Sequence, residues 1–448
     1  MLKGVTMLRS PGASLPSWAI FFLPIVIVLI LLLPQGVQAR WSLVPRVYVE
    51  EQYDSNLFVT EKNEKDDFAT VISPGVNLAY ETPTALVNLD YGYRHFFYYD
   101  FTDLDYDDHR GTLEARKDFG PRFSLALSDV LLRSKDPIEF TGQEESQLPS
   151  IRAGERNRYT RNIVRPEATF RFAERSSLKL GYQNQILRND AENVADQDEN
   201  RANALLGHRF GIHHGIELFY EYINQDFGST TPPQPSGDFK ANTGRGRYTY
   251  YFDPKSSMFF EYLYVDKDVD QESAAFSDYQ LHNARLGFSR DLYENFSVSA
   301  SAGYLLRRAH DQNDVDGITG RLNFSGQYKR LETNVYGETG YGDDFTSAEI
   351  RGFFHFWRGG GNATYQLLER LRAETSFSVN RQKFLDINRT DTYYNFRGGL
   401  RYQVLKWLFF SLDYEYNNRD SNVPLLGYTR NRVFFRVTFQ HDIAETYQ

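Results

Sequence analysis

The residues in this sequence with the clearest capacity for chemistry are charged side chains spaced two apart. In residues 429–440, Arg432 and Arg436 alternate with the apolar residues Val433 and Phe435. Successive side chains of a β-strand point to opposite faces, so this spacing predicts one face with guanidinium groups and one apolar face. A guanidinium group binds carboxylates and phosphates well, and such a face could therefore contact an anion.

Equivalent charged positions recur along the chain, and we expect them on one continuous polar face. The basic candidates are Arg94, Arg247, Arg321, Arg397, Arg401, Arg432 and Arg436. The acidic candidates are Asp90, Glu217, Glu261, Glu374, Asp413 and Glu415. Because the acids nearly balance the arginines, two interpretations stay open: a path for an anionic polymer, or a network of ion pairs that stiffens a wall. Phe409, Phe434 and Tyr393 share this face and could stack on sugars or be isolated wall residues.

The alternation also predicts the elements that position these residues. Residues 296–307, 318–328, 371–380 and 408–419 each alternate apolar with polar or charged side chains. A transmembrane barrel strand has this pattern because lipid covers one face and a hydrated interior the other. A charge that faces lipid near the midplane costs about 2–4 kcal/mol, so the charged faces are predicted to line a hydrated lumen. A strand of a soluble sandwich is the alternative, because both kinds of strand alternate with period two and the period alone does not distinguish them.

Tight turns divide the chain at regular intervals. They are expected at residues 82–84, 120–121, 173–176, 213–215, 253–256, 292–295, 329–331, 368–370 and 405–406. This rhythm predicts an all-β fold, a transmembrane antiparallel up-and-down β-barrel of about 18–20 strands. Longer polar connections are expected at residues 61–67, 100–108, 189–200 and 266–273, and the one long gap between turns contains a long segment at residues 136–155. Short turns of such barrels usually face the periplasm, so these acidic connections are predicted to surround the outer mouth.

The N-terminus has the features of a secretory signal peptide. Lys3 and Arg9 precede an apolar run at residues 19–33, which is short for a helix that crosses about 30 Å of hydrocarbon. A helix breaker and small residues follow this run. We therefore expect residues 1–39 to be removed and residues 40–448 to form one outer-membrane barrel domain, with an uncleaved anchor as the alternative.

Composition excludes several classes of function. The sequence has no cysteine, which excludes disulfide scaffolds, thiol catalysis, covalent haem attachment and cysteine-ligated metal sites. Its formal net charge of −9 argues against nucleic acid as a partner. The 31 Tyr and 35 Phe suit a lipid-facing surface with interfacial girdles. The chain has no Gly-x-Ser-x-Gly signature and no loop with EF-hand spacing, so we expect neither an enzyme nor a cofactor.

Two parts of the sequence resemble a known family. They are residues 53–58 (YDSNLF), 65–68 (KDDF) and 72–76 (ISPGV) near the start, and residues 418–422 (NRDSN) and 428–433 (YTRNRV) near the end. These stretches resemble the putative beta-barrel porin 2 family. The resemblance implies an outer-membrane barrel of the kind found with exopolysaccharide biosynthesis and export systems, and it brings no catalytic residues.

The alternation, the signal peptide and the resemblance together favour a passive pore in the cell outer membrane for export of an extracellular polysaccharide. Two alternatives are a general diffusion porin and a non-conducting barrel that acts as a sheath or scaffold for a partner protein. The expected partners are outer-membrane lipid, the barrel assembly machinery and periplasmic polysaccharide export proteins. The last strand resembles a C-terminal assembly signal, although residues 441–448 continue beyond Phe439.

Overall fold

The structure is a computed structural model of the chain, and it is almost entirely β-structure. It describes residues 39–140, 149–151, 156–230, 237–270, 277–293, 295–310, 312–345 and 350–447. The predicted signal peptide, residues 1–39, lies outside the described residues except for Ala39, which begins the first strand. A single-turn helix, η1 (Thr102–Leu104), lies between two strands. No helix among the described residues is long and apolar enough to cross a membrane.

The strands follow one another around a closed wall. They are β1 (Ala39–Asp54), β2 (Asp67–Thr82), β3 (Ala85–Tyr98), β4 (Tyr106–Asp118), β5 (Phe123–Ser134), β6 (Ile138–Phe140), β7 (Pro149–Ile151), β8 (Tyr159–Ala173), β9 (Ser176–Asn189), β10 (Gln197–Phe210), β11 (His214–Phe227), β12 (Phe239–Asp253), β13 (Ser256–Val269), β14 (Tyr279–Tyr293), β15 (Phe296–Ala309), β16 (Val315–Tyr328), β17 (Leu331–Phe345), β18 (Ile350–Leu368), β19 (Leu371–Phe384), β20 (Arg389–Leu405), β21 (Leu408–Ser421), β22 (Tyr428–Gln440) and β23 (Ile443–Tyr447).

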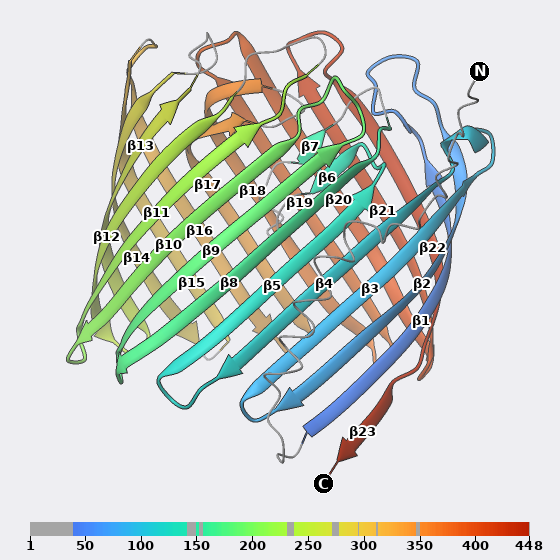
Figure 1. Cartoon of the computed structure of the whole chain (residues 1–448), viewed down its shortest axis with the longest axis horizontal. Helices are drawn as coiled ribbons and strands as arrows, with labels where there is room; N and C mark the ends of the chain where they lie inside the picture. Colours follow the sequence, from blue (N-terminus) through green and yellow to red (C-terminus); the bar gives the residue numbers. More distant parts are fainter. Residues whose placement is uncertain are drawn as a thin grey trace, which may run out of the picture.

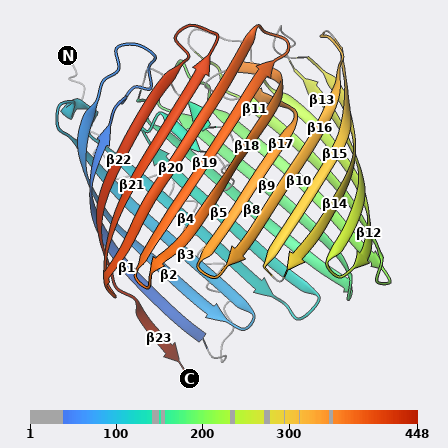
Figure 2. The same ribbon diagram turned by 180° about the vertical axis from the view of Figure 1, so that it is seen from behind.

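Twenty of these strands, β1–β5 and β8–β22, form the wall within the described residues. Each is antiparallel to its neighbours, and β1 pairs with β22 from Arg46 opposite Gln440 to Asp54 opposite Arg432. This last pairing closes the barrel, as Figures 1 and 2 show from opposite sides. The structure thus confirms the predicted antiparallel barrel and the upper end of the predicted strand number.

The tight turns lie where the sequence predicts them. Residues 83–84 join β2 to β3, and residues 406–407 join β20 to β21. These turns and the start of β1 lie at one end of the barrel, called the short-turn end below, near the C-terminus in Figure 1. The longer connections lie at the opposite end, called the long-connection end. This arrangement arises because each strand is joined to the next by a local connection, alternately a short turn at one end and a longer connection at the other.

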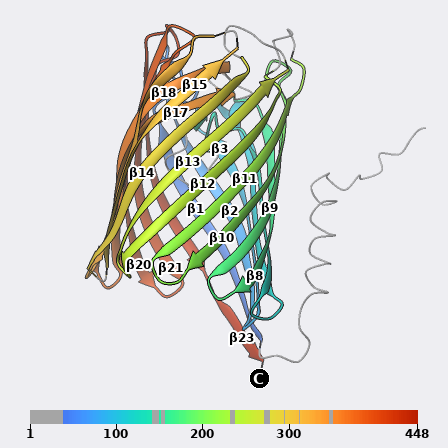
Figure 3. The ribbon, with the colours of Figure 1, turned by 90° about the vertical axis from the view of Figure 1, so that its left-hand side faces the viewer.

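The strands are longer than the sequence predicts. Three of the connections expected to be irregular contain strand residues, because β4 begins at Tyr106, β10 begins at Gln197 and β13 ends at Val269. Inward charged side chains of two of these segments are paired within the barrel: Asp108 of β4 contacts Arg94, and Lys267 of β13 contacts Asp343. Two short elements are also additional to the prediction: the β6–β7 hairpin inside residues 136–155, and β23, which pairs with the start of β1 and extends beyond the short-turn end (Figure 3).

Large apolar side chains cover the outer face. Leu286, Leu322 and Phe377 are each more than half exposed there. Toward the long-connection end, outward tyrosine hydroxyls donate hydrogen bonds to asparagine side chains of the next strand. These bonds join Tyr182 to Asn200, Tyr220 to Asn242 and Tyr414 to Asn431. Tyrosine with an apolar ring and a hydrogen-bonded hydroxyl is typical of the membrane–water interface, so these residues indicate one boundary of the lipid-covered band.

Candidate functional site

The inner face of the barrel is the candidate functional site. In β16, Ile318 and Leu322 are 69% and 54% exposed on the outer face, and Arg321 lies on the opposite face of the same strand. The same alternation places all the predicted charged residues on the inner face. They are Arg94, Arg247, Arg321, Arg397, Arg401, Arg432, Arg436, Asp90, Glu217, Glu261, Glu374, Asp413 and Glu415. Their role in lining a transport path stays a prediction.

One group of predicted residues forms a network on β11–β14. Arg247 approaches Glu261 to 2.5 Å and Glu217 to 3.9 Å. The Glu261 carboxylate also accepts a hydrogen bond from Arg285, and the Glu261 side chain is completely buried between these guanidinium groups. Burying a carboxylate is costly unless it is paired and hydrogen-bonded, and the two arginines supply both kinds of compensation.

Most other predicted residues are paired in the same way. The remaining pairs are Arg94–Asp108, Arg46–Asp90 at 2.5 Å, Arg372–Glu374 at 2.8 Å, Arg397–Asp413 at 3.7 Å, Arg397–Glu415 at 3.6 Å, Arg432–Glu415 at 2.5 Å and Arg436–Glu50 at 2.5 Å. Arg321 and Arg401 have no ion pair within the described part of the chain. The geometry therefore favours the ion-pair network over a path of free arginines.

The aromatic residues predicted on the inner face do not form an open stacking surface. The Arg401 guanidinium lies 4.8 Å from the ring centre of Phe409, and Arg432 lies 5.3 Å from that of Phe434. Tyr393 is buried. Stacked guanidinium groups stabilise these rings through cation–π contacts but occupy the faces that a sugar would need. The interpretation as wall residues is therefore favoured.

A buried ion-pair cluster stabilises the seam between the first and last strands. Arg430 of β22 contacts Asp54 of β1 at 2.5 Å, and both side chains are only 1% exposed. Asp136, in the connection after β5, contacts Arg430 and Arg432 at 3.3 Å each. The sequence predicts Arg432 as a site residue but not the other three, because their partners lie hundreds of residues away.

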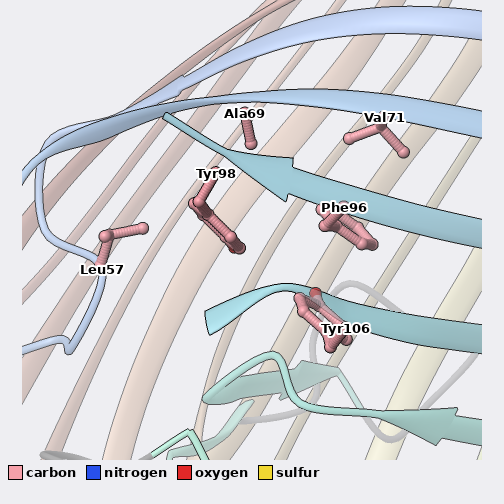
Figure 4. Packing of buried hydrophobic residues seen from close by; sticks show 6 residues of the cluster. All are labelled: Leu57, Ala69, Val71, Phe96, Tyr98 and Tyr106. Carbon is pink, nitrogen blue, oxygen red and sulfur yellow. The ribbon is translucent and has the colours of Figure 1, made fainter. Parts of the chain in front are cut away.

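The connection between β1 and β2 folds into the lumen beside this seam. The Asn56 side chain donates to the backbone oxygens of Thr429 at 3.0 Å and Thr60 at 2.7 Å. Leu57 packs in a buried cluster with Tyr98 and other inward residues of β2–β4, as Figure 4 shows. Asn56 and Leu57 belong to the first segment that resembles the family, and Thr429 belongs to the last. The two segments thus contact each other at the seam where β1 and β22 close the barrel.

A second inward element is the end of the β17–β18 hairpin, described at residues 340–345 and 350–354. β17 pairs with β16 only as far as Thr339, and beyond that residue it pairs with β18 alone. Asp343 of this hairpin contacts the ammonium of Lys267 on β13 at 2.5 Å and accepts a hydrogen bond from Tyr279 on β14 at 2.7 Å. Phe353 packs against the Tyr279 ring. The hairpin end therefore lies over the inner face of β13 and β14 and narrows the lumen at the long-connection end.

Further buried charges lie at the same end. Asp391 on β20 is completely buried and contacts Arg389 at 2.8 Å and Arg419 at 3.0 Å. In the connection after β19, burial raises the pKa of Asp386, and the nearby Arg307 guanidinium opposes this rise. No group of three or more histidine and acidic side chains among the described residues has a geometry that could hold a metal ion. The chemistry of the lumen is thus that of paired charges, amides and hydroxyls.

Solved outer-membrane proteins share this architecture. The FrpB iron transporter from Neisseria meningitidis (F3-3 variant) is 11% identical, with a TM-score of 0.53 over 92% of this chain and 83% of that one. The siderophore receptor PirA from Pseudomonas aeruginosa is 10% identical, with a TM-score of 0.51 over 91% and 81%. PirA from Acinetobacter baumannii is 8% identical, with a TM-score of 0.51 over 89% and 80%. At these identities the likeness concerns the fold alone. No curated protein matches the sequence.

These observations define the class of protein. A closed antiparallel barrel with an apolar outer face, an interfacial tyrosine belt and a charged lumen is an outer-membrane β-barrel of the porin or transporter kind, located in the outer membrane. Residues 220–441 of the chain match the family described as putative beta-barrel porin 2. The predicted resemblance is confirmed over that stretch, which includes the terminal segments 418–422 and 428–433; residues 53–76 lie outside the match.

Proposed function

We propose that this protein is a passive outer-membrane pore through which an extracellular polysaccharide leaves the cell. The observation that supports this function best is the polar lumen of a wide barrel. Barrels of 16–18 strands already leave an aqueous channel, and the interior widens with strand number. A wall of 20 strands therefore has room for a channel beside the β1–β2 connection and the β17–β18 hairpin, which narrow the lumen at the long-connection end. A hydrated polymer needs such width together with a wall that does not bind it too tightly.

The charge arrangement of the wall is consistent with this role. Because most inward arginines are neutralised by inward acids, a passing chain meets a hydrated surface of almost balanced charge rather than strong fixed sites. The protein carries no element that could supply energy among its described residues, so transport would be driven by partners. Periplasmic polysaccharide export proteins at the short-turn end and the barrel assembly machinery are the partners that we propose.

A deletion strain tests this function. We expect loss of the surface polysaccharide, with uptake of small hydrophilic solutes unchanged, and recovery when the gene is restored. Polymer should accumulate in the periplasm of the deletion strain, because only the last step of export is blocked. The measurements are total and surface-bound polysaccharide and the rate of uptake of a chromogenic periplasmic substrate.

The alternatives predict other outcomes of the same experiment. Normal surface polysaccharide with slower solute uptake would contradict export and identify a general diffusion porin. Normal polysaccharide and normal uptake, together with a stoichiometric partner that co-purifies with the barrel, would instead identify a sheath around another protein.

A further inference from the structure

Serine and asparagine side chains are concentrated in one region of the lumen wall, on β15–β21, where the ion pair Arg397–Glu415 continues their register on β20 and β21. Two adjacent rows of inward residues cross these strands in register. The first row is Ser297, Ser325, Asn334, Asn362 and Ser376. The second row includes Ser299, Asn323, Ser378, Asn395 and Asn417. We call these two rows the amide track.

The amide track lies in hollows of the wall. A cavity of about 610 Å³ lies toward the short-turn end. Its lining includes Ser297, Ser325, Asn334 and Asn362, and also the acidic residues Asp291 and Glu332. A second cavity, of about 170 Å³, lies further along the same rows. Its lining includes Ser376, Ser378, Asn395 and Asn417, and also the paired charges of Arg397 and Glu415. Neighbouring strands are about 4.8 Å apart, so the two rows extend around the wall over several sugar lengths.

The chemistry of the track matches hydroxyl groups. Serine hydroxyls and asparagine amides both donate and accept hydrogen bonds, as sugar hydroxyls do. Few of these groups are satisfied internally: Ser297 and Ser325 share one bond of 2.7 Å, and Asn395 donates to Ser378 at 3.3 Å. The buried side-chain oxygen of Asn334 has no hydrogen-bond partner among the described residues. An acceptor in this position costs free energy unless water or a ligand donates to it.

The charged rows cannot take this role equally well. Arg321, Glu338 and Arg358 form the next row toward the long-connection end, and Arg358 contacts Glu338 at 2.7 Å. A ligand hydroxyl that bound there would have to compete with an existing charge-assisted hydrogen bond. A ligand hydroxyl that bound a serine or asparagine of the amide track would not have to compete with a charge-assisted hydrogen bond of that residue.

We propose that the amide track binds uncharged sugar units, and that the polysaccharide which passes through this pore is neutral along most of its length. This inference rests on the proposed export function and specifies its substrate class. The track would act as a series of weak, equivalent sites near the periplasmic entrance. Weak and repeated hydrogen bonding lets a polymer enter the lumen without trapping it there.

The test is block of single-channel current by defined oligosaccharides, using the protein purified from outer membranes. Cellohexaose is the neutral probe and hexagalacturonate the acidic one, each added to either side of the bilayer. We expect cellohexaose to block the wild-type pore at lower concentration than hexagalacturonate. Asn334→Leu combined with Asn362→Leu is expected to raise the half-blocking concentration of cellohexaose about tenfold, as loss of two hydrogen bonds predicts.

A matched control replaces an amide elsewhere on the inner face. Asn203 lies on β10, across the barrel from the track, and Asn203→Leu should leave cellohexaose block unchanged. If the leucine pair does not fold, Asn334→Ala with Asn362→Ala removes the same amides with less bulk. Each folded variant should keep the wild-type conductance in salt alone.

The outcomes separate this inference from the proposed function. Block by hexagalacturonate alone, or cellohexaose block that both track variants leave unchanged, would overturn the neutral-sugar assignment while leaving an export pore. An open channel that neither sugar blocks would contradict the export function itself and the track with it.

Discussion

Asp54→Ala is expected to lower the free energy of unfolding of the barrel by about 3–5 kcal/mol. Asp54 pairs with Arg430 across the seam between β1 and β22, and both side chains are almost fully buried. Removing the carboxylate leaves a buried guanidinium whose nearest remaining acid is Asp136 at 3.3 Å. The measurement is urea-induced unfolding in phospholipid vesicles, followed by tryptophan fluorescence.

Two controls identify the cause of this loss. Asp198→Ala removes one member of an exposed pair, with Arg188 at 2.8 Å, and should cost no more than about 1 kcal/mol. Asp54→Leu combined with Arg430→Met should recover much of the lost stability, because an apolar pair replaces the two buried charges while Asp136 keeps its contact with Arg432. A cost for Asp54→Ala as small as that for Asp198→Ala would show that the seam pair does not stabilise closure.

Leu322→Arg is expected to destabilise the membrane-inserted barrel by about 2–4 kcal/mol. Leu322 is 54% exposed near the middle of β16 and lies on the outer face. The neighbouring residue Asn323 lies on the inner face, so Asn323→Arg should change stability by less than about 1 kcal/mol. Both changes introduce the same side chain into the same strand, and only its direction differs.

The comparison is made by measuring the fraction of folded barrel in vesicles through heat-dependent gel mobility. If the two variants were equally stable, or if Asn323→Arg were the more damaging, the assignment of outer and inner faces would be wrong. The result therefore checks the alternation of the wall independently of any transport activity.

The wall of the barrel could be predicted because its signals are local. Period-two alternation within β16 and β21 places each side chain on a face without knowledge of the rest of the chain. The turns at residues 83–84 and 406–407 are likewise marked by their own residues. For the same reason the inward direction of Arg321 and Asp413 follows from their immediate neighbours.

The contents of the lumen could not be predicted because they depend on distant partners. Lys267 stands in an acidic stretch that resembles a solvated loop, yet β13 includes it, and Asp343 of another hairpin pairs with it. Asp54 and Arg430 are separated by 376 residues. Nothing in the sequence near Gly340 or Gly342 marks the point where β17 leaves β16.

Single-channel current through the purified protein in a planar bilayer tests most directly whether this barrel is a pore. We predict a stable, ohmic conductance in salt, together with concentration-dependent block by an added oligosaccharide. A silent bilayer from protein whose folding is confirmed by β-rich circular dichroism would contradict the pore. The inward hairpin residues 340–345 and 350–354 and the β1–β2 connection would then close the lumen, and the barrel would act as a sheath or scaffold.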